Sequence, residues 1–265
     1  MASSIKSADT QSQSGERATT TMDAVSIPTP DVPVPRRVRT LARGAAVSPV
    51  WVNGVGGVTF RADDGRYIKV GPVHRETSMS AEAERLRWAA PYTAVPDVLE
   101  VGDDGDEEWL VTRAVPGLSA VDPLWIAEPE VAVRAIGAGL RALHDALPVA
   151  DCPFDWSVRT RIGNAAARGI HVPGALRSPP PIDALVVCHG DACAPNTLLD
   201  AEGRPLAHVD LGALGVADRW ADIAVAAMST TWNYGPGWEH ALIDAYGIAA
   251  HEPRMAYYRD LWNAT

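Results

Sequence analysis

The chain has 265 residues, enough for one large or two small domains, and carries a net charge of −10 at pH 7. No apolar stretch reaches about 18 residues, and no charged segment followed by an apolar one opens the chain, so we expect a soluble cytoplasmic protein that contacts no membrane. Its three cysteines are odd in number and lack the spacing of a zinc site, which argues against a disulfide framework and a structural metal.

The negative charge gathers toward the C-terminus. From Asp183 onward, eleven acidic residues stand against four arginines, which gives this segment a charge of −7. Such an excess disfavours nucleic acid as a partner and favours a cationic small molecule. An acidic surface that only keeps the protein soluble explains the same numbers equally well.

Lysine usage is more specific. The chain contains 21 arginines but only two lysines, Lys6 near the N-terminus and Lys69 within an apolar run. A lysine kept inside a predicted strand suggests a site that needs a compact ammonium group, such as a phosphate contact, where the planar fork of arginine would not serve.

The first part of the chain predicts a tail followed by a sheet. Residues 1–37 are rich in Ser, Thr, Gln and Pro, and we predict a disordered tail there. A short helix is expected over 38–46, and strands are predicted at 49–52, 58–61 and 66–70. The first two strands flank a turn with Gly54, Gly56 and Gly57, whose backbone N–H groups could approach phosphates, although glycines in hairpins more often serve only the turn. The third strand carries Lys69. A glycine-rich hairpin followed by a strand with a lysine is the order typical of a nucleotide-binding lobe.

A helix is predicted from a cap at Ser80 to residue 91. Glu82 and Glu84 both lie on it, and either could pair with Lys69 and aim the ammonium at nucleotide phosphates. The glutamate that is not used would be an ordinary exposed helix charge.

Two more strands are predicted at 95–101 and 109–114. The segment 113–117 then stands where a hinge would join two lobes, and backbone groups there would receive adenine. Arg113 and Val115 are therefore candidate nucleotide contacts, on the basis of position alone.

The second half of the chain predicts mostly helices. A strong amphipathic helix is expected over 128–147, and His144 near its end is expected to pack or cap instead of reacting. For residues 156–181 no element is predicted. Two further helices are expected between Glu239 and the end of the chain.

One stretch carries the chemistry. Apolar runs flank a loop with Asp191 and, five residues later, Asn196, and another apolar run ends in Asp210. Any one of these residues alone would be taken for a turn former. Together they can gather three oxygen-bearing side chains, of which Asn196 and Asp210 suit Mg²⁺ and Asp191 remains as a candidate base.

The residues His189-Gly190-Asp191 and Asp210-Leu211-Gly212 stand where protein kinases carry His-Arg-Asp and Asp-Phe-Gly. These variants resemble the aminoglycoside phosphotransferases, as do Cys152-Pro153-Phe154 and the run from Gly212 to Ala224. The resemblance covers residues from about 48 to 262. It implies an α+β, two-lobed protein-kinase-like fold: an N-lobe at 38–115 with an antiparallel sheet and one main helix, and a mostly helical C-lobe at 116–265.

The resemblance also implies roles. Asp191 would act as the base, Asn196 and Asp210 would hold Mg²⁺, and Lys69 would contact the phosphates of ATP. Glu82, six residues before Trp88 as in this family, is preferred over Glu84 as the partner of Lys69. His189 and Asp222 would support the catalytic loop, with Asp222 accepting backbone N–H bonds, and Asp218 would cap the following helix. The candidates for binding a cationic substrate are Glu239, Asp244 and Asp260, each of which a solvated helix face explains better when taken alone.

Two departures from the family pattern affect the substrate side. Relatives often carry arginine directly after Asp-Leu-Gly, where this chain has Ala213. The chain also lacks the acidic pair that usually closes the last helix of the family.

The activity implied is ATP-dependent phosphorylation of an aminoglycoside hydroxyl by a monomeric resistance enzyme. The segments Trp232–Pro236 and Cys188–Asn196 are most similar to streptomycin 3''-phosphotransferases. One alternative is a kinase of another antibiotic or metabolite, and another is a non-catalytic binding protein with a kinase-like fold. The presence of Lys69, Asp191, Asn196 and Asp210 together argues against the second.

Overall fold

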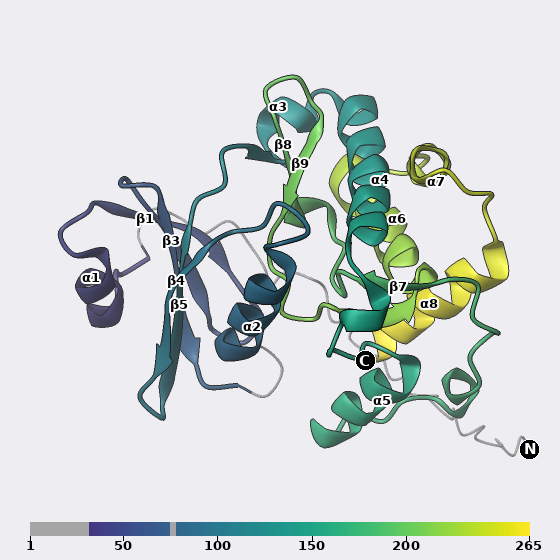
Figure 1. Ribbon diagram of the computed structural model, residues 1–265, viewed down its shortest axis with the longest axis horizontal. Helices are drawn as coiled ribbons and strands as arrows, with labels where there is room; N and C mark the ends of the chain where they lie inside the picture. Colours follow the sequence, from purple (N-terminus) through teal and green to yellow (C-terminus); the bar gives the residue numbers. More distant parts are fainter. Residues whose placement is uncertain (1–31, 75–77) are drawn as a thin grey trace, which may run out of the picture.

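The computed structural model describes residues 32–74 and 78–265 and shows a sheet-containing lobe beside a mostly helical one (Figure 1). The predicted two-lobed α+β architecture is thus confirmed. Most of the predicted tail falls outside the described residues, but its last two residues, Arg36 and Arg37, open a helix instead. None of the helices in the described ranges is long and apolar enough to cross a membrane.

The N-lobe is built on an antiparallel sheet with the strand order β1-β2-β3-β5-β4. Its strands are β1 (Val47–Val52), β2 (Val58–Ala62), β3 (Arg66–Pro72), β4 (Val98–Asp103) and β5 (Glu107–Arg113). All five were predicted, with ends shifted by a few residues. The turn between β2 and β3 contains Gly65 with φ +81°, a conformation that glycine adopts without strain.

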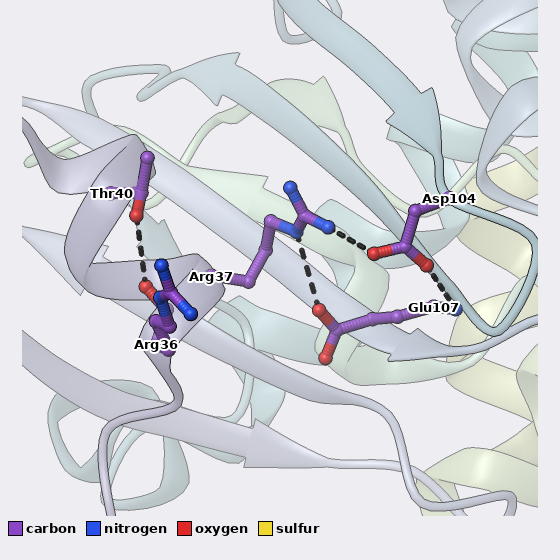
Figure 2. Close-up of a pocket in the computed structure, with 5 residues that line it drawn as sticks. All are labelled: Arg36, Arg37, Thr40, Asp104 and Glu107. Carbon is purple, nitrogen blue, oxygen red and sulfur yellow. Dashed lines mark hydrogen bonds and ion pairs between the residues drawn. The ribbon is translucent and has the colours of Figure 1, made fainter.

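Helix α1 (Arg36–Ala42) covers one face of this sheet, where Val38 and Leu41 pack against Phe60, Ile68 and Val70. Since side chains alternate along a strand, Lys69 points to the opposite face of β3. A polar hollow lies beside α1 and is lined by Arg36, Arg37, Thr40, Asp104 and Glu107 (Figure 2). Arg37 pairs there with Asp104 and Glu107. Because α1 covers the face of the sheet opposite Lys69, the hollow is separate from the Lys69 site.

Helix α2 (Met79–Ala89) lies on the Lys69 side and packs against β4 and β5. The cap predicted at Ser80 is wrong: the Ser78 side chain accepts the N–H of Ala81 at 3.2 Å. The helix begins one residue earlier than Ser80 because the buried Glu108 carboxylate accepts the N–H of Met79 at 2.9 Å. A contact with a distant strand thereby decides between two serines that could each serve as a cap.

The C-lobe is organised around α4 (Pro129–Ala146), which matches the predicted helix and packs along α7 and α6. The remaining helices are α3 (Pro123–Ile126), α5 (Val158–Ala167), α6 (Trp220–Tyr234), α7 (Glu239–Tyr246) and α8 (Glu252–Ala264). Helix α5 was not predicted. Its N-cap is Ser157, whose side chain accepts the N–H of Thr160 at 3.3 Å.

Short strands of the C-lobe carry the loops with the predicted catalytic residues. β7 (Leu185–Cys188) pairs with β10 (Gly215–Asp218), and β6 (Leu118–Ser119), β8 (Thr197–Leu199) and β9 (Pro205–His208) form a second small sheet. Single 3₁₀ turns lie at Val149–Asp151, Gly174–Arg177 and Ala194–Asn196. The last of these joins the loop after β7 to β8, so β7, β8 and β9 together frame the predicted catalytic stretch.

Candidate active site

Lys69 joins the two lobes through two carboxylates. Its Nζ lies 2.7 Å from Glu82 Oε1 and 2.9 Å from Glu82 Oε2, and 3.0 Å from Asp210 Oδ1. Glu84, the other candidate partner, is exposed on α2. The structure therefore brings Lys69, Glu82 and Asp210 into one cluster.

The charges in this cluster support one another. Burial alone would lower the pKa of Lys69, but Asp210 and Glu82 outweigh it and hold the pKa above the usual value for lysine. The pKa of Asp210 is lowered, chiefly by the Lys69 charge. Burial raises the pKa of Glu82 in spite of Lys69. Lys69 is thus a permanent cation near neutral pH, the state required to contact phosphate oxygens.

The predicted catalytic loop, residues 189–196, is folded so that Asn196 bonds both Asp191 and the residue before Asp210. The Asn196 Nδ2 donates to the Asp191 carbonyl oxygen at 2.9 Å, and the Val209 N–H donates to the Asn196 carbonyl oxygen at 3.0 Å. The second bond continues the pairing of β8 with β9, which places the residue after Val209 beside the loop. Asp210 itself takes the left-handed conformation, with φ +63°.

These residues fit a hard divalent cation. Because the Asn196 Nδ2 is used by Asp191, the amide oxygen is the atom left for a ligand, and 45% of the Asp210 side chain is exposed. Asp191 Oδ1 is buried without a hydrogen-bond partner among the described residues. Burial raises the pKa of Asp191, and the neighbouring Asp210 charge adds to that rise. A cation beside these oxygens would relieve this unfavourable clustering of negative charge.

A second cluster of metal-ligand types, formed by His144, Cys188 and Asp222, lies in the core of the C-lobe, with ligand atoms within 4.8 Å of one another. His144 Nε2 and Asp222 Oδ2 already bond to each other at 3.0 Å. Burial raises the pKa of the Cys188 thiol well above its usual value, so the thiol stays neutral. The cluster is therefore part of the packed core.

The Asp222 carboxylate anchors the backbone at the start of the predicted catalytic loop. This carboxylate is fully buried and accepts the N–H of His189 at 2.6 Å and the N–H of Gly190 at 2.9 Å, besides the bond from His144. The His189 ring also bonds to the Val209 carbonyl oxygen at 3.0 Å, which ties the loop to the strand before Asp210. The bonds from two backbone N–H groups are the kind of contact predicted for Asp222. That Asp222 and His189 support a catalytic loop stays a prediction.

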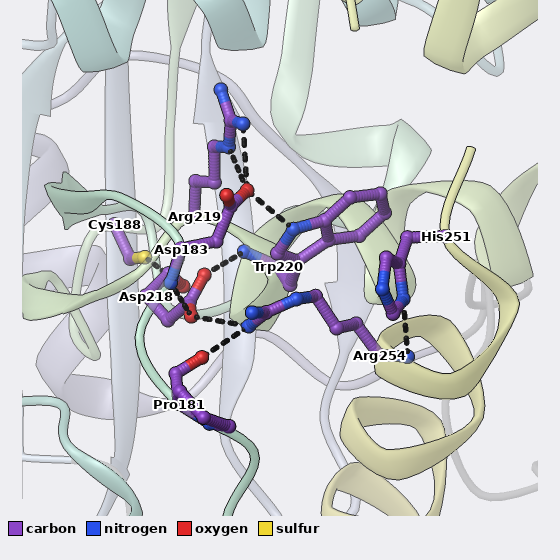
Figure 3. Close-up of polar contacts among 8 residues, drawn as sticks. All are labelled: Pro181, Asp183, Cys188, Asp218, Arg219, Trp220, His251 and Arg254. Atoms are coloured by element: carbon purple, nitrogen blue, oxygen red, sulfur yellow. Dashed lines mark hydrogen bonds and ion pairs between the residues drawn. The ribbon is translucent and has the colours of Figure 1, made fainter. Parts of the chain in front are cut away.

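A network of polar contacts surrounds the start of α6 (Figure 3). Asp218, which is only 4% exposed, accepts the N–H of Trp220 at 3.1 Å and that of Asp183 at 2.8 Å, and it pairs with Arg254 of α8 at 3.3 Å. Asp183 in turn accepts the indole N–H of Trp220 at 2.8 Å. The N-cap position of α6 is occupied by Arg219, so Asp218 bonds the first helical residue from one position earlier, and it links α6, α8 and the segment before β7.

Gly190 packs directly against the segment after Asp-Leu-Gly. Its φ is +86°, and a Cβ there would collide with the backbone carbonyl and side chain of Ala213. No residue with a side chain fits between the catalytic loop and Ala213 in this arrangement. The two motifs are thus in direct contact.

The Asn53 side chain stabilises the glycine-rich turn by bonding to its backbone. Its Oδ1 accepts the N–H of Val55 at 3.1 Å and the N–H of Gly57 at 2.6 Å. A Cβ on Gly71 would lie 2.8 Å from Gly57 Cα, so the turn that also holds Gly54 and Gly56 folds over β3 just beyond Lys69. A role for the Asn53 side chain was not predicted, although an asparagine directly before glycine is a recognised turn signal.

The predicted hinge contacts lie apart from this cluster. The Arg113 side chain is exposed and pairs with Asp97 at 3.5 Å, and its N–H bonds to the Asp97 carbonyl oxygen. Val115 lies half-buried in the irregular connection between β5 and β6. An adenine contact by the backbone at Arg113 and Val115 stays a prediction.

The predicted substrate contacts are spread over α7 and α8. Glu239 pairs with Arg259 at 2.5 Å, whereas Asp244 and Asp260 are exposed. Within the described ranges, no hydrogen bond or ion pair joins these three acids to the catalytic loop. Their role in substrate binding stays a prediction.

One loop contact was not foreseen. Ser229 of α6 accepts the N–H of Ala194 at 2.8 Å through its side chain, and its Oγ also receives a bond from Asn233. Nothing in the local sequence distinguishes Ser229 from other helix serines, because its partner lies 35 residues away.

Comparisons with known proteins agree with this geometry. The chain matches the phosphotransferase enzyme family (APH) over residues 39–169 and 165–258. It is 36% identical over 223 residues to the aminoglycoside 3'-phosphotransferase of Streptomyces fradiae, covering 73% of this chain and 83% of that protein. It is 34% identical over 241 residues to the streptomycin 3''-kinase of Streptomyces griseus, covering 78% of this chain and 87% of that protein.

Among solved structures, the aminoglycoside phosphotransferase APH(3'')-Id from Streptomyces rimosus, in complex with ADP and streptomycin, superposes with a TM-score of 0.64 at 27% identity. The match covers 84% of this chain and 94% of that chain. Sequence and fold therefore lead to the same group of proteins. On both grounds, the chain belongs to the phosphotransferase enzyme family.

Proposed function

We propose that this protein transfers the terminal phosphoryl group of ATP to a hydroxyl group of an aminoglycoside. The observation that carries the proposal is a set of contacts that brings these residues together: Glu82 and Asp210 both bond Lys69, and Asn196 bonds the backbone of Asp191 and of Val209, the residue before Asp210. It combines a permanent cation, a set of oxygen ligands and a buried carboxylate, which are the parts that phosphoryl transfer requires.

Each part has a role in the proposed reaction. Lys69 binds phosphate oxygens of the nucleotide, and Glu82 keeps its ammonium in place. Asp191 orients the acceptor hydroxyl and accepts its proton as the oxygen attacks. Asn196 and Asp210 would hold Mg²⁺, which when bound neutralises charge on the phosphate oxygens.

The loop is arranged so that positioning does most of the work. Asp222 fixes the backbone of His189 and Gly190, and Asn196 fixes the carbonyl of Asp191, so the base is held before the substrates arrive. Reactions that need little covalent help from the protein gain most from such preorganisation.

Within this class we propose the 3''-hydroxyl of streptomycin as the acceptor. Support comes from the streptomycin 3''-kinase of Streptomyces griseus and from the Streptomyces rimosus enzyme, which was solved with streptomycin bound. The 3'-hydroxyl of another aminoglycoside is the second candidate, because the Streptomyces fradiae 3'-enzyme is of similar identity.

The test is a phosphotransfer assay with purified protein, Mg²⁺ and either ATP or GTP. Streptomycin and kanamycin serve as acceptors, and a macrolide serves as a control outside the class. Mass spectrometry identifies the product, and NMR of the phosphorylated product locates the phosphate. Phosphate on the 3''-hydroxyl of streptomycin supports the full proposal, whereas phosphate on a 3'-hydroxyl of kanamycin alone moves the acceptor to the second candidate. Turnover of no aminoglycoside with either nucleotide overturns it.

A further inference from the structure

The cluster around Lys69 depends on the placement of α2, because Glu82 belongs to α2 whereas Asp210 belongs to the segment after β9. Building on the proposed phosphotransfer, we propose that Arg85 is a positioning residue: it ties α2 to the segment that follows Asp210 and so keeps Glu82 bonded to Lys69. The described contacts of Arg85 are with Leu214, Ala81 and Phe154, none of which has a proposed part in the chemistry, so its effect would be exerted through Glu82.

Arg85 contacts the C-lobe at two points. Its Nε donates to the Leu214 carbonyl oxygen at 2.9 Å, and its guanidinium carbon lies 4.5 Å from the centre of the Phe154 ring. A third bond, from Nη1 to the Ala81 carbonyl oxygen at 3.0 Å, fixes the side chain to its own helix. Since residues three apart lie on one face of a helix, Arg85 and Glu82 approach the C-lobe together.

The two anchors of Arg85 both belong to the frame of the active site. Leu214 closes the turn after Asp210, because its N–H donates to the Leu211 carbonyl oxygen at 3.0 Å. The Phe154 carbonyl oxygen accepts the N–H of Val216 at 2.9 Å, just beyond that turn. Within the turn, Gly212 faces the Glu82 side chain. Arg85 and Glu82 therefore hold the same short segment from one face of α2.

Stability alone does not explain a guanidinium in this place. Burial lowers the pKa of Arg85, and the acceptors of its hydrogen bonds are backbone carbonyls instead of carboxylates. A partly buried cation without a bonded carboxylate gains little net stability. The shape of the guanidinium explains the choice of arginine at position 85, because this planar group can bond the carbonyl oxygens of Leu214 and Ala81 and lie against the Phe154 ring at the same time.

The first test uses Arg85→Met, which keeps most of the apolar stem, and Arg85→Lys, which keeps the charge. Arg87→Met is the matched control, because Arg87 lies on the exposed side of the same helix. We expect Arg85→Met to lower kcat about tenfold, Arg85→Lys to lose less, and the control to stay within about twofold of the parent. Thermal unfolding of each variant is measured alongside. Wild-type kcat in a folded Arg85→Met protein overturns the proposal.

A double-mutant cycle tests whether Arg85 acts through Glu82. Glu82→Gln is combined with Arg85→Met, and the losses in kcat are compared. If Arg85 serves only to position Glu82, adding Arg85→Met to the Glu82→Gln protein costs no more than about a further twofold. Full multiplication of the two single losses would show a separate, general structural role and would contradict the proposal.

The third test does not need turnover. Replacing Lys6 by arginine leaves Lys69 as the only lysine of the chain. Its acylation by an amine-selective reagent, followed by peptide mass spectrometry, then reports how firmly its ammonium is held by Glu82 and Asp210. We expect Arg85→Met to speed this acylation about tenfold, with no change in Arg87→Met. An unchanged rate overturns the positioning role, whereas a faster rate in a protein that phosphorylates no aminoglycoside leaves it standing and refutes only the proposed function.

Discussion

The proposed nucleotide side and the proposed acceptor side of this protein differ in how their charged groups are held. On the nucleotide side, Lys69, Glu82 and Asp210 bond to one another across the two lobes. On the acceptor side, the acids predicted to read the substrate are either paired with a neighbouring arginine, as Glu239 is with Arg259, or exposed to water.

This difference corresponds to two requirements, the positioning of atoms for phosphoryl transfer and the recognition of the acceptor. The proposed phosphoryl transfer needs a few atoms at fixed positions, and short motifs on adjoining strands supply them. The predicted acceptor contacts lie on α7 and α8, whose placement depends on packing against α4 and α6, and no short motif specifies this packing. We therefore expect large effects from changes on the nucleotide side and at the loop, and small ones from single changes at the predicted acceptor contacts.

The largest effect is expected for Asp191→Asn. The amide can occupy the space of the carboxylate but cannot accept the proton of the hydroxyl, so kcat should fall about 10³-fold. Nucleotide binding, measured by calorimetry, should stay near normal because Lys69 and Asp210 are untouched. A variant with unchanged kcat would remove Asp191 from its assigned role.

Asp222→Asn comes next, because it weakens the support of the loop. An amide oxygen cannot replace two carboxylate oxygens that accept three bonds, so we expect a loss of about 3 kcal/mol in the free energy of unfolding. Burial by itself would raise the pKa of the Asp222 carboxyl. The hydrogen bond from His144 and the other contacts outweigh burial, so the pKa lies below the usual value of 3.8.

The sign of the pH effect follows. A carboxylate with a lowered pKa in the folded state stabilises the protein above pH 3.8, and this contribution is lost as the pH falls through the folded-state pKa. Urea unfolding at a series of pH values should therefore show a steeper acid loss for the parent than for Asp222→Asn. Parallel curves would assign the acid sensitivity to other groups.

A smaller change is expected from Glu82→Gln, with Glu84→Gln as its control. Removing the charge beside Lys69 weakens a charge-assisted pair, and kcat/KM for ATP should fall about tenfold. Glu84 is exposed on the same helix, so its variant should stay within about twofold of the parent. Equal losses in the two variants would contradict the specific pairing of Glu82.

The smallest effects should come from Glu239→Gln, Asp244→Asn and Asp260→Asn. Glu239→Gln leaves the Arg259 charge unpaired, so KM for a cationic acceptor should rise about threefold. The two exposed acids are screened by water and should change KM by less than about twofold. A rise above about tenfold for any of them would identify that acid as a direct contact and would narrow the difference between the two sides.

The sequence was most informative where the residues involved lie close together in the chain. The loop from His189 to Asn196 and the Asp210 motif are separated by one hairpin, so their meeting could be predicted from strand pairing. The helix over 128–147 was equally accessible because its apolar period runs over five turns.

Long-range contacts account for what was missed. The start of α2 depends on Glu108, a residue of another strand. Helix α5 buries only Arg161, Ile162 and Ala165, too few to produce a clear apolar period. Arg85 and Ser229 act on backbone groups 129 and 35 residues away, and no local pattern marks such partners.

The contact between Gly190 and Ala213 limits how this chain can vary. A side chain at position 190 would require the segment after Asp-Leu-Gly to retreat, and that segment carries Asp210 with it. Tolerated replacements at position 190 would thus need a matching change around position 213. The close fit that completes the site also makes these two positions interdependent in any future divergence of the sequence.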